Sequence, residues 1–398
     1  MPQLSLCMIV KNEEAILAEC LESVKDVVDE MIVLDTGSTD RTVAIAEEYG
    51  AKIPHFSWCD DFSAARNEAL RHVTGDWVLV LDADEQLNPA IANRLKTEIT
   101  KDNNLVINLI RQEIGAKQSP YSLTSRLFRH HPKIQFSRPY HALIDDSVID
   151  LIRQEPDWQI TQLPSIAIFH YGYTPQAIQT LDKTNRAKAA MEKFLVQHPN
   201  DPYTCSKLGA LYLQLEQPKK GLKLLRRGLK SNLANANVLY ELHYHLANAY
   251  IKQKEIDKSI KHFEKAISQT ILPQLKLGAF NNYGAFLHSL GDSRKAIKLF
   301  EMALEIDGKF TQGYYNLGMI YKNLNQIEQA INAYKKAIEC DPYYAPSYQN
   351  LGVLFLKIGN MTAAKMAFAQ AIDLYDQQNP DEAQRLRDGL KDFGMEFG

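Results

Sequence analysis

Hydrophobic positions follow two different rhythms along the 398-residue chain. Up to about residue 200, short apolar runs of strand length alternate with amphipathic stretches. The clearest runs are residues 4–10, 31–34, 52–56, 77–81 and 105–110. Between them, apolar residues recur three or four positions apart, as one face of a helix requires; they are Ile16, Leu17, Cys20, Leu21, Val24, Val43, Ala46, Tyr49, Ala65, Ala69 and Leu70. Alternating strands and helices predict an α/β domain whose mainly parallel sheet is covered on both faces.

After residue 200 the pattern repeats every 34 to 38 residues. A small residue follows a large apolar one at Gly209, Ala247, Gly284, Gly318 and Gly352. Small residues let two helices of one unit approach closely, while large ones fill the gap to the next unit. Residues 314–342, YYNLGMIYKNLNQIEQAINAYKKAIECDP, resemble the tetratricopeptide (TPR) consensus. We therefore expect an all-α TPR solenoid of about five repeats over 201–398, clearest at 277–310, 311–344 and 345–378.

Charge and cysteine content narrow the range of partners. The first 200 residues hold 20 Lys and Arg against 28 Asp and Glu, and the rest hold 25 against 20. An acidic first half favours metal-mediated binding of an anion and argues against nucleic acid. The five cysteines form no CxxC pair, which argues against disulfides and zinc. There is no apolar run of the ~20 residues that span a membrane and no basic signal start, so we expect a cytoplasmic protein.

Polar, acid-bearing turns follow three of the predicted strands. They are residues 11–14 (KNEE), 35–40 (DTGSTD) and 82–85 (DADE). Ligands of parallel sheets bind beyond the carboxyl ends of the strands, so we expect these turns to meet at one edge. Glu13 and Asp40 also have a structural reading, because carboxylates suit a first helical turn. Asp82 and Asp84 end a buried strand, where two carboxylates repel each other unless a cation such as Mn²⁺ or Mg²⁺ lies between them.

Four segments resemble family 2 glycosyltransferases with a GT-A fold. They are LSLCMIVKNEE (4–14), DEMIVLDTGSTDRT (29–42), FSAARNEAL (62–70) and GDWVLVLDADEQL (75–87), in the order and approximate spacing of that family. The branch that they resemble carries C-terminal TPRs. The resemblance implies a Rossmann-like GT-A domain that transfers a sugar from a nucleotide-sugar donor, usually with inversion and with a divalent metal.

The same resemblance implies roles for individual residues. The donor would be bound by Val10, Asn12, Glu13, Asp35, Asp40, Arg66 and Asp82. The metal on the donor diphosphate would be bound by Asp82, Asp84 and His170. His170 ends the apolar run 166–169, and a histidine at a strand end also has a purely structural reading. A helix from about residue 175 to 197 is expected to close the domain.

The acceptor side is less well defined. Residues 125–146, SRLFRHHPKIQFSRPYHALIDD, resemble the acceptor segment of the same branch, where many members have His-Glu. This chain has His141 followed by Ala142, so the general base stays open among His141, Asp145 and Asp146. A reference pKa of ~6.5 suits His141 for proton abstraction near neutral pH, but a role in packing alone is an equal alternative.

These patterns predict a two-domain enzyme. Residues 1–200 would transfer a hexose-type sugar to an acceptor peptide, glycan or lipid-linked sugar, and residues 201–398 would recruit the acceptor or another protein or peptide. Asn316 and Asn350, on the first helices of their repeats, are candidates for that contact. The alternative is an interaction scaffold with a catalytically inactive first domain, which only the His141-Ala142 pair favours.

Overall fold

The computed structural model describes residues 1–116, 119–140, 142–172 and 181–395. The chain divides into two compact units. The first comprises residues 1–249 and 269–275, and the second comprises residues 250–268 and 276–398. None of the described helices has the length and apolar character needed to cross a membrane.

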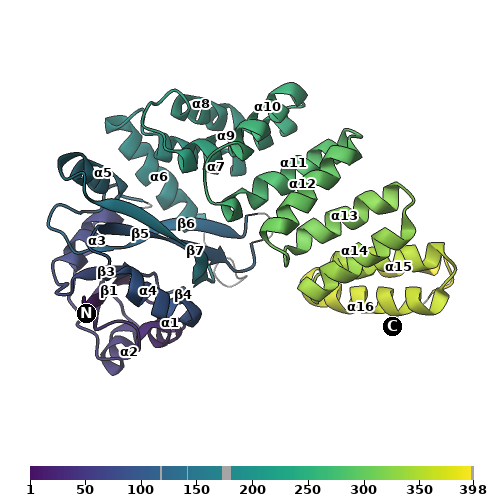
Figure 1. Ribbon diagram of the computed structural model, residues 1–398. Helices are drawn as coiled ribbons and strands as arrows, with labels where there is room; N and C mark the ends of the chain where they lie inside the picture. Colours follow the sequence, from purple (N-terminus) through teal and green to yellow (C-terminus); the bar gives the residue numbers. More distant parts are fainter. Residues whose placement is uncertain (117–118, 141, 173–180, 396–398) are drawn as a thin grey trace. The chain divides into compact units, whose positions relative to one another are not determined.

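The first unit is built on a mixed sheet, which has seven strands within the described residues, in the order β2-β1-β3-β6-β5-β7-β4 (Figure 1). The strands are β1 Leu4–Val10, β2 Glu30–Asp35, β3 Trp77–Val80, β4 Glu85–Leu87, β5 Asn104–Glu113, β6 Tyr121–Arg129 and β7 Gln159–His170. β1 pairs in parallel with both β2 and β3, as predicted. Beyond β3 the pairing is mixed, because β6 runs antiparallel to β3 and β5 while β7 runs parallel to β5. β4 closes the far edge antiparallel to β7.

Helices cover both faces of this sheet, as the amphipathic stretches predicted. They are α1 Leu17–Val24, α2 Thr42–Glu48, α3 Phe62–Leu70, α4 Ala92–Glu98, α5 Asp145–Gln154 and α6 Leu181–Gln197, with the short η1 Pro89–Ile91 before α4. One core joins α1, α2 and α4 to the sheet and includes Leu21, Leu79 and Leu95. A second core joins α3 and α5 to the opposite face and includes Ala69 and Phe128. The apolar positions of the sequence therefore form two cores, one on each face of the sheet.

The predicted strand at residues 52–56 was wrong. This segment runs beside β2 but forms only isolated bridges, at Lys52 and His55. Pro54 has no N–H group and cannot donate to a ladder, although its carbonyl accepts a hydrogen bond of 2.9 Å from the Asp35 N–H. The proline limits the segment to isolated bridges beside the edge strand β2.

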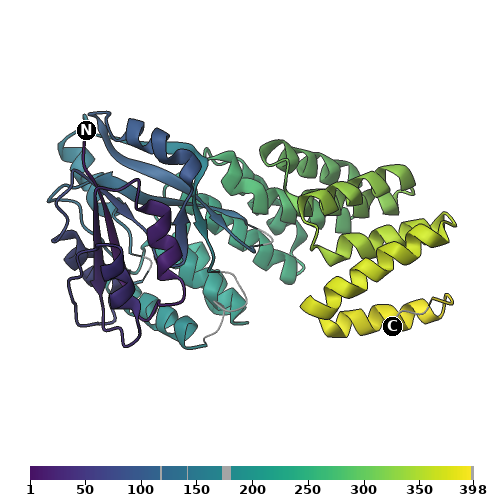
Figure 2. The same cartoon turned by 90° about the horizontal axis from the view of Figure 1, so that it is seen from below.

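Antiparallel helix pairs make up the rest of the chain. They are α7 Pro202–Gln214, α8 Pro218–Gly228, α9 Ala236–Lys252, α10 Ile256–Ile267, α11 Leu277–Ser289, α12 Ser293–Ile306, α13 Thr311–Asn323, α14 Ile327–Cys340, α15 Ala345–Lys357, α16 Met361–Gln378 and α17 Pro380–Lys391, with η2 Pro273–Lys276 before α11. Figure 2 shows the pairs of the second unit stacked in sequence order. A Cβ atom added to Gly318 would lie 2.7 Å from the Tyr334 ring, and one added to Gly352 would lie 2.7 Å from Phe368. The small positions of the repeat therefore permit close helix contact, as predicted.

Candidate active site

The first two predicted turns lie side by side at the carboxyl ends of β1 and β2. The Asn12 N–H donates to Ser38 Oγ (3.0 Å), and the Thr39 N–H donates to Asn12 Oδ1 (2.8 Å). The Glu13 N–H donates to Thr42 Oγ1 (2.7 Å). Asn12 has a φ of 56°, in the left-handed region that asparagine tolerates better than most residues. The parallel pairing of β1 with β2 thus joins the two turns into one polar loop pair.

Asp35 and Asp40 hold this loop pair in shape. Asp35 is 5% exposed and accepts hydrogen bonds from the N–H groups of Gly37 (3.1 Å) and Ser38 (3.0 Å). Burial raises its pKa, but the hydrogen bonds from Ser38 and Gly37 outweigh burial and lower it. Asp40 accepts from Thr42 Oγ1 (2.5 Å) and from the Glu14 N–H (3.2 Å). Both carboxylates have structural contacts here, and their predicted contact with a donor stays a prediction.

Asp82 stands at the end of β3 between two arginines. Arg66 of α3 donates to its Oδ1 (2.6 Å), and Arg126 of β6 donates to its Oδ2 (2.7 Å). Burial raises the pKa of Asp82, but the charges of Arg126 and Arg66 outweigh burial and hold it far below its usual range. Asn67 of α3 holds the neighbouring chain by accepting from the Phe136 N–H (2.7 Å). Because both oxygens of Asp82 already have a guanidinium partner, its predicted role as a metal ligand would require one of these bonds to open.

A charged network continues from Asp82 into the sheet. Glu85, which is fully buried, accepts from Arg126 and from Arg111 (2.7 Å). Arg111 also pairs with Glu113 (2.9 Å). Alternating positive and negative groups therefore connect β3, β4, β5 and β6, and each buried carboxylate has at least one guanidinium neighbour, as burial of charge requires.

His170, the last residue of β7, joins this network to Asp84. Its Nδ1 lies 2.5 Å from Glu113 Oε2, and its Nε2 lies 3.2 Å from Asp84 Oδ2. Burial lowers the pKa of His170, but its bonds to Asp84 and Glu113 outweigh burial and raise it to about 9. Burial likewise raises the pKa of Glu113, and His170 with Arg111 lowers it to about 2. The structure thus brings two of the three predicted metal ligands, Asp84 and His170, into direct contact.

The Asp84–His170 pair fits a divalent ion. A carboxylate on the second ring nitrogen, as Glu113 is here, is the usual partner that orients a metal-binding histidine. Gly172 keeps the Nε2 side open, because a Cβ there would lie 2.5 Å from His170 Nε2 and 3.1 Å from Asp84 Oδ2. Across the described ranges no group of three or more His, Cys, Asp or Glu side chains could hold an ion. The pair would therefore share the ion with water and with the phosphates of a donor, as Mg²⁺ commonly does.

The three candidate bases have different surroundings. His141 lies outside the described residues. Asp146 accepts from Arg138 (2.7 Å) and from Ser137 Oγ (2.7 Å), so its charge is paired. Asp145, in the first turn of α5, has an Oδ2 atom that is buried without a hydrogen-bond partner. Burial raises the pKa of Asp145. A raised pKa brings a carboxylate closer to the value that suits proton abstraction near neutral pH.

Four charged residues of the network were missed by sequence reasoning. They are Glu85, Arg111, Glu113 and Arg126. Glu85 closes the acid-bearing turn at 82–85 but was given no role, and Arg111 and Glu113 follow the predicted strand at 105–110, so a charged pair just after a strand was a usable signal. Arg126 gave no such signal, because it lies within β6 and reaches Asp82 only through the pairing of β6 with β3.

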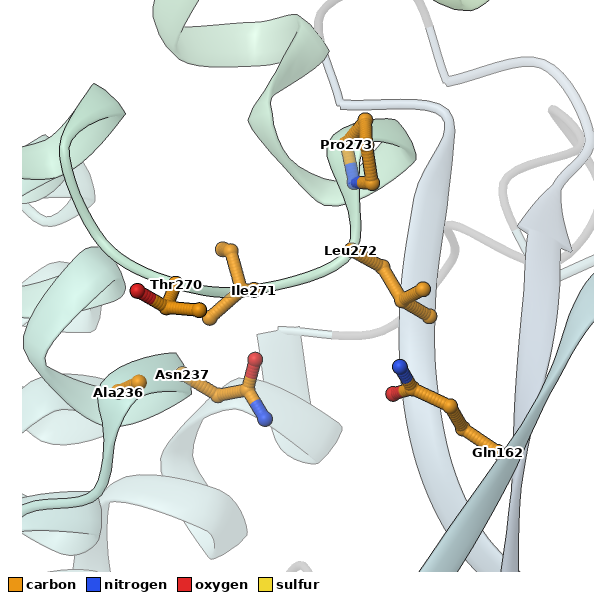
Figure 3. A pocket seen from close by; sticks show the side chains of 7 residues that line it. All are labelled: Gln162, Ala236, Asn237, Thr270, Ile271, Leu272 and Pro273. Carbon is orange, nitrogen blue, oxygen red and sulfur yellow. The ribbon is translucent and has the colours of Figure 1, made fainter.

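A separate cavity lies in the same unit, away from these charges. It has a volume of about 310 Å³ and is lined by Gln162, Ala236, Asn237, Thr270, Ile271, Leu272 and Pro273. Figure 3 shows the side chains of Asn237 and Gln162 projecting into the space between α9 and β7. Asn237 Oδ1 is buried without a hydrogen-bond partner. None of the lining residues is charged, and none belongs to the predicted site.

Known proteins match both parts of the chain. Residues 5–161 match glycosyl transferase family 2, and residues 240–270, 277–310, 311–344 and 333–366 match tetratricopeptide repeats. A TPR repeat-containing protein of Synechococcus elongatus is 48% identical over 282 residues, which cover 71% of this chain and 70% of that protein.

Two further relatives are glycosyltransferases. An uncharacterized glycosyltransferase of Rickettsia conorii is 39% identical over 205 residues, which cover 49% of this chain and 71% of that protein. The glycosyltransferase SunS of Bacillus subtilis is 27% identical over 237 residues, which cover 58% of this chain and 54% of SunS. The order of motifs, the sheet that carries them and these relatives agree, and the chain belongs to the family 2 glycosyltransferases that carry C-terminal TPR repeats.

Proposed function

We propose that the first unit transfers a sugar from a nucleotide-sugar donor to an acceptor, with inversion and with a divalent ion. The observation that supports this most strongly is the contact between Asp84 and His170 (3.2 Å) at the strand ends, beside the arginine-bound Asp82. Gly172 leaves room beside the pair, because a Cβ there would lie 2.5 Å from His170 Nε2 and 3.1 Å from Asp84 Oδ2. Mn²⁺ suits this mixed oxygen and nitrogen pair better than Mg²⁺, which prefers oxygen ligands.

On the donor side, charged groups would stabilise the nucleoside diphosphate as it leaves. A bound divalent ion supplies Lewis-acid stabilisation of the leaving nucleoside diphosphate. Arg66 and Arg126 hold Asp82 ionised and in one orientation, so once one of these two bonds opens the carboxylate would bind the ribose or the ion without a change of protonation state. The loop pair around Asn12 and Asp35 forms the adjoining rim, where the base and ribose would bind.

The acceptor side would supply the base. Inverting transfer needs one group that takes the acceptor's proton on the face opposite the leaving group. Asp145 has the strongest support among the candidates, since its carboxylate is partly buried and its pKa is raised. Asp146 is held in an ion pair with Arg138, and His141 remains the alternative from the sequence.

The repeats would recruit the acceptor or a partner protein. Asn316 of α13 donates to Asn281 Oδ1 of α11 (2.8 Å), and Lys322 donates to Asn350 Oδ1 of α15 (2.6 Å). These amides link the first helices of successive repeats in the second unit. Helical repeat arrays commonly present such a surface to a peptide or protein segment.

A donor screen tests the proposal. Uridine, guanosine and thymidine diphosphate sugars are added to the full chain with Mn²⁺, with Mg²⁺ or with a chelator, and the melting temperature is measured. A ligand that binds only the folded state raises that temperature, so we expect one nucleotide class to do so only with metal. Release of nucleoside diphosphate then measures slow donor hydrolysis.

The screen also separates the enzyme from the alternative scaffold. A catalytically inactive first domain would release no nucleoside diphosphate from any donor above the rate in buffer. If no donor shifts the melting temperature and none is hydrolysed, the scaffold is the better description, and the repeats alone would carry the function.

A further inference from the structure

Arg138 occupies an unusual position between the predicted acceptor segment and the first helix of the repeats. It is only 8% exposed, and its backbone φ is 75°, a left-handed conformation that is uncommon outside glycine. Its Nη1 donates to Asp146 Oδ2 of α5 (2.7 Å), and its Nη2 donates to Asp201 Oδ2 at the start of α7 (2.7 Å). One buried guanidinium therefore joins two helices that are far apart in sequence.

Aromatic rings complete the surroundings of this guanidinium. Arg138 Cζ lies 5.5 Å from the centre of the Tyr203 ring of α7 and 6.0 Å from the centre of the Phe194 ring of α6. Aromatic faces attract a guanidinium in addition to its ion pairs. Burial lowers the pKa of Arg138, but Asp201 and Asp146 outweigh burial and raise it, so the group stays charged.

The turn that begins at Arg138 is held from several sides. Ser137 and Leu143 exchange backbone hydrogen bonds of 2.8 and 3.0 Å across its base. The Pro139 carbonyl accepts from the Phe62 N–H at the start of α3 (3.0 Å), and the Tyr140 ring lies 5.7 Å from the Phe62 ring. The turn is thus attached to the donor-side helix α3 at its tip and to α7 through Arg138.

Asp201 has two roles that can be separated by substitution. Its Oδ1 accepts from the Thr204 N–H (2.7 Å), which makes it the N-cap of α7, while its Oδ2 binds Arg138. Asparagine caps helices as well as aspartate does, so Asp201→Asn keeps the cap and removes the charge. Asp292 caps α12 through the Lys295 N–H (3.1 Å) and provides a control in the second unit.

We propose that Arg138 is a positioning residue: by binding Asp201 and Asp146 together, it fixes the acceptor-side turn and the first turn of α5 against the first repeat helix. Two of the three candidate bases, Asp145 and Asp146, stand in that first turn. The first repeat is therefore part of the catalytic unit as well as part of the array. This inference deepens the proposed function and rests on it for its catalytic consequence.

Hydrogen exchange of the full chain tests the positioning without any ligand. In Asp201→Asn we expect the amides of Ser137 and Leu143 to exchange about 10-fold faster, because opening of the turn becomes easier. Arg138→Lys should show the same change, since an ammonium group cannot bridge two carboxylates as a guanidinium fork does. Asp292→Asn should leave both amides unchanged. Equal exchange in all four proteins would overturn the proposal.

Donor hydrolysis tests the catalytic consequence, with the nucleotide sugar that shifts the wild-type melting temperature most. We expect kcat to fall about 10-fold in Asp201→Asn while KM stays within about 2-fold, because misplacement of the base affects the chemical step and not donor binding. A kcat equal to that of Asp292→Asn would overturn the catalytic role. If the wild type binds no donor, the proposed function fails, while hydrogen exchange still decides whether Arg138 positions the turn.

Discussion

The network at the sheet edge and the helix contacts of the second unit bury their side chains in opposite ways. At the sheet edge, Glu85 is fully buried and accepts hydrogen bonds from the guanidinium groups of Arg111 and Arg126 and from the Asp82 N–H (2.9 Å). In the second unit glycines face aromatic rings, and a Cβ atom added to Gly318 or Gly352 would lie 2.7 Å from the ring of Tyr334 or Phe368, respectively. Charged side chains are buried at the sheet edge, where chemistry is expected, whereas the side chains buried in the described residues of the second unit are uncharged.

This contrast determines what a substitution should do in each region. Loss of a buried arginine leaves the buried carboxylates of the network with fewer partners, so stability and activity should change together. A change of volume in a helix contact affects local packing, and activity at the sheet edge should be spared. All three tryptophans, Trp58, Trp77 and Trp158, belong to the first unit. Tryptophan fluorescence therefore reports unfolding of that unit alone.

The largest effect is expected from Arg126→Ala. This change leaves fully buried Glu85 with one guanidinium partner fewer and removes a partner of Asp82. Breaking a buried ion pair costs about 3–5 kcal/mol, and the free energy of unfolding is measured in urea by tryptophan fluorescence. Arg153→Ala is the control, because Arg153 forms an exposed pair with Asp150 and should cost under about 1 kcal/mol. Equal losses in the two variants would remove the distinction between the network and ordinary surface pairs.

Asp84→Asn should reduce activity strongly and stability little. Asp84 is partly exposed and contacts His170 alone among the network members through its side chain. Loss of a ligand to a Lewis-acid ion should lower metal-dependent donor hydrolysis about 100-fold or more, with chelator giving the same result in the wild type. Asp26→Asn, at an exposed carboxylate of the same unit, should hydrolyse donor at the wild-type rate. Full activity of Asp84→Asn would refute the metal assignment.

Local patterns predicted the elements of both regions well. Residues 4–10 form β1 as expected, and Leu17, Cys20, Leu21 and Val24 are the buried face of α1. The spacing of small residues in the repeats predicted the helix contacts, because those contacts lie within one unit of about 34 residues. The strand and helix periodicity and the spacing of small residues both depend on residues close in sequence, so they can be recognised in a single sequence.

The sequence predicted the carboxylates Asp82 and Asp84 of the charged network but not Arg126, which pairs with Asp82, because this arginine is distant in sequence. Asp82 and Asp84 stand out locally as carboxylates that end an apolar strand. Their partners Arg126 and His170 lie 44 and 86 residues away. These distances are bridged by the pairing of β3 with β6 and of β4 with β7, and no local spacing encodes that pairing. Strand β6 and its Arg126 were therefore missed together.

Gly352→Ala tests the helix contacts of the second unit. The added Cβ would lie 2.7 Å from the Phe368 ring, and such overpacking costs about 1–3 kcal/mol. Far-ultraviolet circular dichroism should show earlier unfolding of helix, while the tryptophan transition and donor hydrolysis stay unchanged. Gly389→Ala is the matched control, because no heavy atom lies within 4 Å of its added Cβ and alanine favours the helix α17 by about 0.5–1 kcal/mol. Earlier unfolding of both variants would contradict the steric explanation.

The smallest effect concerns His245 of α9, which belongs to the first unit. Burial lowers the pKa of His245 to about 4, and nearby Glu241 only partly opposes burial. In the unfolded chain a histidine has a pKa of ~6.5. Between these values the unfolded state binds a proton that the folded state does not, so stability is lost as pH falls from about 6.5 towards 4. His170 does not interfere in this window, because its raised pKa acts between pH 6.5 and 9.

His245→Gln should therefore weaken the acid dependence of the first unit. The wild type should lose up to about 1.4 kcal/mol more per pH unit than the variant between pH 6.5 and 4.5. Urea unfolding followed by tryptophan fluorescence at three pH values measures this difference, and comparison of the two proteins cancels the contributions of the other carboxylates and histidines. Parallel pH profiles would show that protonation of His245 does not destabilise the fold, and that its side chain in α9, the first helix of the second repeat, is accessible to water. A difference of the expected sign would show that α9 buries a titratable group, His245, as the sheet edge buries its charged groups. Buried titratable groups would then occur in the first repeats as well as at the sheet edge of the first unit.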